Sequence, residues 1–141
     1  MSITRVALAS IAAFVAYFAF GFLVFAVAGG PLRREYEKYK SIFRSQDSMK
    51  SVMPFGMLAI LVAIVVLAIL YAYSYRGGSV LAAGAQFGAL AGLFIVCTFV
   101  IHNYVNLNIG LRLTVLQAIA YFTQWMVVGM VIAAVYRPAP V

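Results

Sequence analysis

The sequence predicts an all-α integral membrane protein: a four-transmembrane-helix bundle with an interfacial amphipathic helix between helices 1 and 2, in one domain. Hydrophobic residues make up 66% of the 141 residues, and charged residues only 9%. A helix needs roughly 20 apolar residues to cross a hydrocarbon core of about 30 Å. Four apolar windows of that length occur, and they do not alternate in polarity as barrel strands would. The windows are approximately residues 6–28, 53–75, 81–102 and 111–136.

The first span resembles a signal peptide in two respects. Arg5 precedes it, and Ala26-Val27-Ala28 has the small residues of a cleavage site. Its apolar stretch of about 22 residues is longer than the roughly 7–15 residues of a signal-peptide core. We therefore interpret residues 6–28 as the first transmembrane helix.

A basic amphipathic segment, residues 31–50, follows the break at Gly29-Gly30, and Pro31 is suited to the first position of a helix. A basic helix with an aromatic apolar face is typical of the membrane interface, where it meets anionic headgroups. The same face would equally suit packing on the end of its own bundle or on a partner protein. The apolar face comprises Leu32, Tyr36, Tyr39, Ile42 and Phe43. The expected lipid or partner contacts are Arg33, Arg34, Lys38, Lys40, Arg44 and Lys50.

The second and third spans form an antiparallel hairpin, because Gly77-Gly78 predicts a tight turn between them. The third span carries Gly84, Gly88 and Gly92 in a GxxxGxxxG ridge. Small residues four apart let helix backbones approach closely in lipid. We expect the ridge to pack on a helix, of this chain or of a neighbour.

The fourth span carries a polar stripe, Thr114, Gln117, Tyr121 and Gln124, at spacings that place all four on one helix face. Polar residues in a span usually hydrogen-bond to another helix. The alternative is that the stripe lines a polar pocket or a transport pathway.

His102, the only histidine, ends the third span, before a turn rich in asparagine. We expect it to make a structural hydrogen bond. A haem, a chlorophyll-type pigment, a quinone or a lipid headgroup is the alternative partner, since ionisable residues in spans are often functional. A metal site built by the chain alone is not expected, because no second histidine is available.

Seven basic residues lie on one side of the spans, and Arg5, Arg76 and Arg137 lie on the other. Positive residues favour the cytoplasm, so both termini should be periplasmic and the loop 29–52 cytoplasmic. The only acids belong to that loop, so no carboxylate lies at membrane depth. Without a carboxylate beside His102, neither an acid–base pair nor a nucleophilic triad can be assembled. The chain is not expected to be an enzyme or to bind nucleic acid.

The stretches "GAQFGALAGLF", "HNYVN" and "LTVLQAIAYFTQWMVVGMVIAAVYRP" are similar to the second half of small four-helix membrane proteins of bacteria. The likeness covers about 55 of the 141 residues and consists mostly of packing motifs. It implies a multi-pass protein of the bacterial inner membrane and brings no catalytic residues with it.

These observations favour a non-catalytic small membrane subunit, or an accessory or assembly protein, of a larger membrane complex. Its partners would be anionic lipid and other membrane chains, or copies of itself. A small homo-oligomeric channel or transporter is the first alternative, with the polar stripe facing the pathway. A protein that binds haem, a pigment or a quinone through His102 is the second.

Overall fold

The computed structural model describes residues 2–27, 29–75 and 77–137, and every regular element among them is a helix. Four stretches are long and apolar enough to cross a membrane, as in a multi-pass membrane protein: Ile3–Val27, Asp47–Ser74, Val80–Asn106 and Leu111–Tyr136. The elements are α1 (Ile3–Val27), α2 (Gly29–Lys38), α3 (Gln46–Ser74), α4 (Val80–Ile95), the π-helix η1 (Val96–Ile101), α5 (His102–Asn106) and α6 (Leu111–Tyr136).

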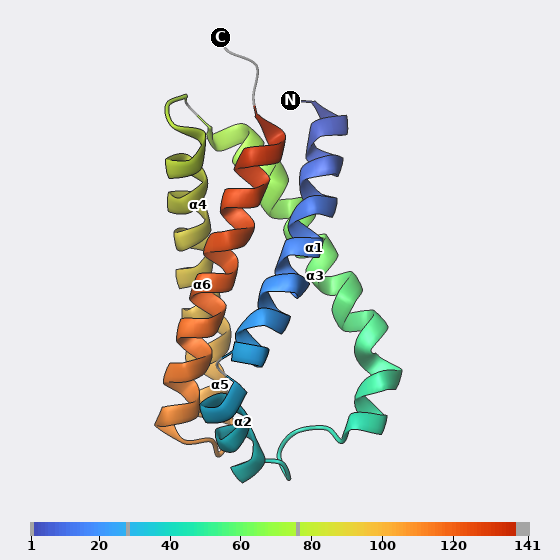
Figure 1. Cartoon of the computed structure of the whole chain (residues 1–141), viewed down its shortest axis with the longest axis vertical. Helices are drawn as coiled ribbons and strands as arrows, with labels where there is room; N and C mark the ends of the chain where they lie inside the picture. The colour runs from blue at the N-terminus through green and yellow to red at the C-terminus, as the bar shows by residue number, and fades with distance from the viewer. Residues whose placement is uncertain (1, 28, 76, 138–141) are drawn as a thin grey trace.

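Helix α6 lies between α4 on one side and α1 on the other (Figure 1). Helix α3 passes α1 about halfway along α1, and its last turns lie near the end of the bundle where α1 begins and α6 finishes, which we call the terminal end (Figure 1). The first half of α3, on the other side of that crossing, diverges from the other helices (Figure 1). Helix α2 and the α5–α6 connection lie at the opposite end, which we call the basic end (Figure 1).

The core is built around α6. Its main cluster joins α1, α3 and α6 through residues that are at most 9% exposed. A smaller cluster at the basic end ties α2 to the start of α6 through Leu32, Ile109 and Leu113. The main cluster comprises Val6, Ala9, Ala13, Tyr17, Ile64, Ala68, Tyr71, Trp125, Val128, Ile132, Ala133 and Tyr136.

The basic segment 31–50 is not one continuous helix. Helix α2 starts at Gly29 and ends at Lys38, and a turn separates it from α3, which already begins at Gln46. The physical reason is a helix start within the segment: Ser45 has extended backbone angles, and its hydroxyl accepts a hydrogen bond from the Ser48 amide (3.3 Å). Such a cap satisfies an amide that a new helix otherwise leaves unpaired.

The third span is also longer than expected, because it continues past His102 to Asn106. It does so through a π-helical segment that the hydrophobic pattern does not reveal. This segment is rich in β-branched residues, which crowd a regular α-turn. The Thr98 hydroxyl also donates a hydrogen bond to the Phe94 carbonyl (2.7 Å). Segments of this kind recur at functional sites in other proteins.

Candidate functional site

The glycine ridge of α4 faces α6 of the same chain. A Cβ added at Gly88 would lie 2.7 Å from the carbonyl oxygens of both Trp125 and Met126. Gly129 of α6 lies opposite, with equally little room for a side chain. Gly84 and Gly92 are likewise buried against α6. The ridge therefore holds the bundle together and is not free to bind a neighbour.

The two glutamines of the polar stripe join α6 to the first half of the chain. Gln124 Nε2 donates a hydrogen bond to the Tyr17 carbonyl of α1 (2.8 Å), and Gln117 Nε2 donates one to the Tyr36 hydroxyl of α2 (2.8 Å). Thr114 is buried, and its hydroxyl donates to the Gly110 carbonyl within α6's own first turn (3.2 Å). The stripe thus includes the interhelical hydrogen bonds expected of polar residues in a span.

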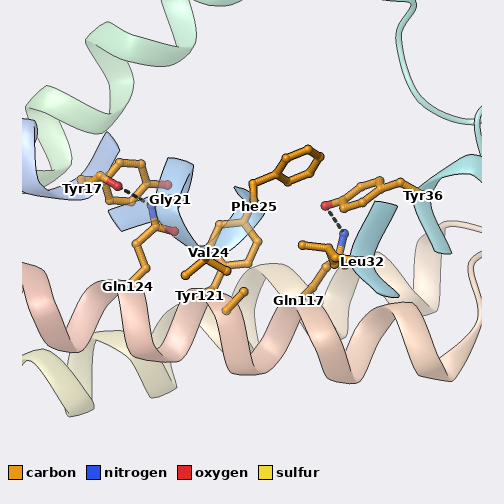
Figure 2. A pocket seen from close by; sticks show the side chains of 10 residues that line it. Tyr17, Gly21, Val24, Phe25, Leu32, Tyr36, Gln117, Tyr121 and Gln124 are labelled. Carbon is orange, nitrogen blue, oxygen red and sulfur yellow. Dashed lines mark hydrogen bonds between the residues drawn. The ribbon is translucent and has the colours of Figure 1, made fainter. Parts of the chain in front are cut away.

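The same stripe borders a cavity of about 240 Å³ between α1, α2 and α6. Figure 2 shows Gln124 and Gln117 at its two ends, each with its hydrogen bond, and Tyr121 between them. Sequence patterning indicated that these three side chains share a face, and the structure adds the wall that α1 and α2 build opposite them. The lining residues are Tyr17, Gly21, Val24, Phe25, Leu32, Tyr36, Gln117, Ala120, Tyr121 and Gln124.

Helix α2 closes the basic end of this cavity and is itself anchored by a buried carboxylate. Glu35 is 3% exposed, and its Oε1 lies 2.7 Å from Lys38 Nζ and 3.5 Å from Arg112 Nε at the start of α6. A buried charge is costly unless it is paired. The pair with Arg112 therefore fixes α2 against α6, and with it the position of Tyr36.

The apolar face of the basic segment packs on its own bundle. Leu32 is buried, and Tyr36, Tyr39 and Phe43 pack with it around the α5–α6 connection, whereas Ile42 remains exposed. This is one of the arrangements that the sequence left open. All six basic residues assigned to lipid or partner contact are exposed: Arg33, Arg34, Lys38, Lys40, Arg44 and Lys50.

Three of these six cations form ion pairs within the described chain. Lys38 pairs with Glu35, Lys40 with Glu37 (3.3 Å), and Lys50 with Asp47 (3.0 Å). No carboxylate of the described residues lies within 4.0 Å of the other three, which leaves the basic end with excess positive charge. These three are Arg33, Arg34 and Arg44.

The sequence did not reveal that the first half of α3 is unpacked. Residues 53–59 are all exposed, although they cover nearly two turns of a helix. The face that α3 packs into the core begins at Ile64, and the same helix face extends back to Met57 and Met53. Gly56, on the same side, has no atom within 4 Å of an added Cβ. Figure 1 shows this half of α3 standing away from α1 and α6.

His102 is exposed at the start of α5. The structural hydrogen bond expected for its ring is not found with any described residue. No group of three or more His, Cys, Asp or Glu side chains that could hold a metal occurs among the described residues. Cofactor binding by His102 stays a prediction.

No protein-family model, curated protein or solved structure matches this chain. The resemblance of the third and fourth spans to bacterial membrane proteins also stays a prediction. Two features of the molecule itself indicate a role: the unpacked half of α3 and the cavity between α1, α2 and α6.

Proposed function

We propose that this protein is a non-catalytic accessory subunit of a larger membrane complex, and that the unpacked half of α3 receives a transmembrane helix of a partner protein. The observation that carries the proposal is the exposure of residues 53–59 on every side of α3. This half continues the helix face that, one turn later, lies in the core of the bundle.

Close packing is what favours helix association in a bilayer, since lipid tails are as apolar as leucine. Near Gly56 a neighbouring backbone can approach α3 without meeting a side chain from that position. Met53 and Met57 flank this point, and they are 49% and 39% exposed. Methionine side chains are flexible and adapt to the shape of a partner. This surface therefore has both the room and the adaptability that a docked helix requires.

Charge favours a foreign chain over a second copy. Residues 29–52 contain six basic and three acidic residues, so this segment carries a net charge of +3. A second copy inserted in the same orientation would bring two such basic ends together, and like charges repel. A partner helix flanked by acidic residues would instead pair with Arg33, Arg34 and Arg44.

We further propose that the basic end faces the cytoplasm of a bacterial inner membrane and that both termini face the periplasm. The excess of lysine and arginine at that end supports this orientation. The transport alternative has less support, because Gln117 and Gln124 donate hydrogen bonds to α1 and α2. These bonds would have to break for the stripe to line a continuous pathway.

The proposal can be tested by purifying the full tagged chain from its native membrane in mild detergent and identifying chains that co-purify in a fixed ratio. Gly56→Trp would block the docking surface, whereas Leu58→Trp places the same side chain nearly opposite on α3, where Leu58 is 59% exposed. We expect the same partner chain with the wild type and with Leu58→Trp, and its loss with Gly56→Trp. A purely homo-oligomeric preparation, or equal recovery of partner with both variants, would contradict the proposal.

A further inference from the structure

We infer that the cavity between α1, α2 and α6 binds a neutral, lipid-soluble molecule whose head carries carbonyl or hydroxyl oxygens. The cavity is separate from the docking surface of α3, since its ten lining residues come from α1, α2 and α6 and none from α3. The ligand would be held within this chain whether or not a partner helix is present.

The size of the cavity suits a ring or a lipid head with part of a chain. In other proteins, an apolar cavity of roughly 150 Å³ is large enough to bind benzene. The volume of about 240 Å³ therefore leaves room for a six-membered ring with substituents, or for a glycerol ester group. Leu32, Val24 and Ala120 supply apolar wall, and Phe25, half exposed, stands at the side away from α6 (Figure 2).

The lining contains hydrogen-bond donors and acceptors that have no partner among the described residues. Each carboxamide has two N–H donors and an oxygen acceptor, and only one donor of Gln117 and of Gln124 is used within the chain. The Tyr121 hydroxyl makes no hydrogen bond to the residues that the structure describes. Because the bilayer core offers no water to satisfy such groups, a ligand oxygen is a favourable partner.

The spacing of these groups matches a ligand with more than one oxygen. Gln117, Tyr121 and Gln124 lie on successive turns of α6, so their positions are about 5 Å apart along the helix axis. No Lys, Arg, His, Asp or Glu lines the cavity. A charged head would therefore lose its hydration without gaining a counter-ion, which is costly. Quinones and diacylglycerols share the required chemistry: neutral, lipid-soluble and carrying carbonyl oxygens.

The single tryptophan provides the readout. Trp125 is 3% exposed, and its ring centroid lies 5.4 Å from that of Tyr17, which lines the cavity. Decylubiquinone bound in the cavity should quench Trp125 fluorescence, and the full chain in mild detergent can be titrated with it. Dioctanoylglycerol, which does not absorb near the tryptophan emission, serves as the competitor.

Two variants and one control connect the signal to the cavity. Ala120→Phe fills the cavity and should abolish saturable quenching, whereas Val115→Phe adds a ring at a position of α6 that is 48% exposed and lies outside the lining. Tyr121→Phe removes one hydroxyl with little change of shape, and should weaken binding about five-fold, the usual effect of one hydrogen bond.

Each outcome decides the inference. Saturable quenching that Ala120→Phe removes and Val115→Phe retains would support it. Displacement by dioctanoylglycerol would then show that the cavity accepts a glycerolipid as well as a quinone, and failure to displace would restrict the ligand to quinones. Quenching that rises linearly in all proteins would overturn the inference, because it would reflect the probe's solubility in detergent alone. Saturable quenching that Ala120→Phe and Tyr121→Phe both leave unchanged would also overturn it. If Ala120→Phe does not fold, Tyr121→Phe alone decides.

Discussion

Replacing Gly88 by alanine tests how tightly α4 and α6 pack. The added Cβ would meet the carbonyl oxygens of Trp125 and Met126 at 2.7 Å and the Met126 Cα at 2.8 Å. All three are backbone atoms, so no side chain can rotate away to make room. Since ordinary van der Waals contact for a Cβ starts at 3.4 Å, the two helices would have to separate locally by about 0.7 Å.

The magnitude follows from two opposing effects. Overpacking a tight contact costs about 1–3 kcal/mol. Exchanging glycine for alanine in a helix gains up to about 1 kcal/mol of backbone preference. Gly56→Ala is the matched control, because Gly56 is also helical but has no atom within 4 Å of the added Cβ. In Gly56→Ala only the gain in helix preference acts, whereas Gly88→Ala has the same gain and the cost of overpacking. The free energy of unfolding of Gly88→Ala should therefore lie about 1–3 kcal/mol below that of Gly56→Ala.

The measurement is reversible unfolding of the purified chain from mild detergent by increasing proportions of SDS, followed by circular dichroism or Trp125 fluorescence. The same titration is run on the wild type, Gly88→Ala and Gly56→Ala. Equal stability of the two variants would refute the close approach of α4 to α6 and, with it, the assignment of the glycine ridge to packing within the chain.

Two further predictions concern single polar groups, and a third concerns the proposed membrane orientation. Gln124→Leu removes the hydrogen bond to α1 (2.8 Å) and should lower the free energy of unfolding by about 0.6–2 kcal/mol in the same titration; no change would show that this bond contributes nothing. Tyr71→Phe should raise that free energy by about 1–3 kcal/mol, because the Tyr71 hydroxyl is buried without a hydrogen-bond partner, and a loss of stability would count against that geometry. In a Cys97→Ser background, a cysteine at Ser41 should react with a membrane-impermeant maleimide only after lysis, and one at Ser2 in intact spheroplasts; the reverse pattern would invert the proposed orientation.

The four spans could be predicted from the sequence because hydropathy and length record which segments can cross a membrane. The shared face of Gln117, Tyr121 and Gln124 could be predicted because helical periodicity determines which side chains point the same way. The cavity that they border could not, since α1 and α2 supply its other wall and that contact depends on tertiary packing.

The unpacked half of α3 escaped prediction for a different reason. Residues 53–59 are as apolar as the rest of the second span, and hydropathy does not distinguish a side chain that faces lipid from one that faces protein. The start of α3 at Gln46 was not predicted, because the hydropathy pattern begins only at the apolar residues further along the chain. The capping role of Ser45 depends on its extended backbone angles, which the sequence does not specify.

The docking of a partner helix on α3 is tested most directly by photocrosslinking in intact membranes. A photoreactive phenylalanine analogue replaces Met57, on the proposed docking face, or Phe55, nearly opposite on the same helix and 74% exposed. Our account predicts that the Met57 position forms an adduct of fixed mass with one foreign membrane chain and that the Phe55 position does not. Adducts with the same chain at both positions, adducts with a second copy only, or no protein adduct at Met57 would contradict it.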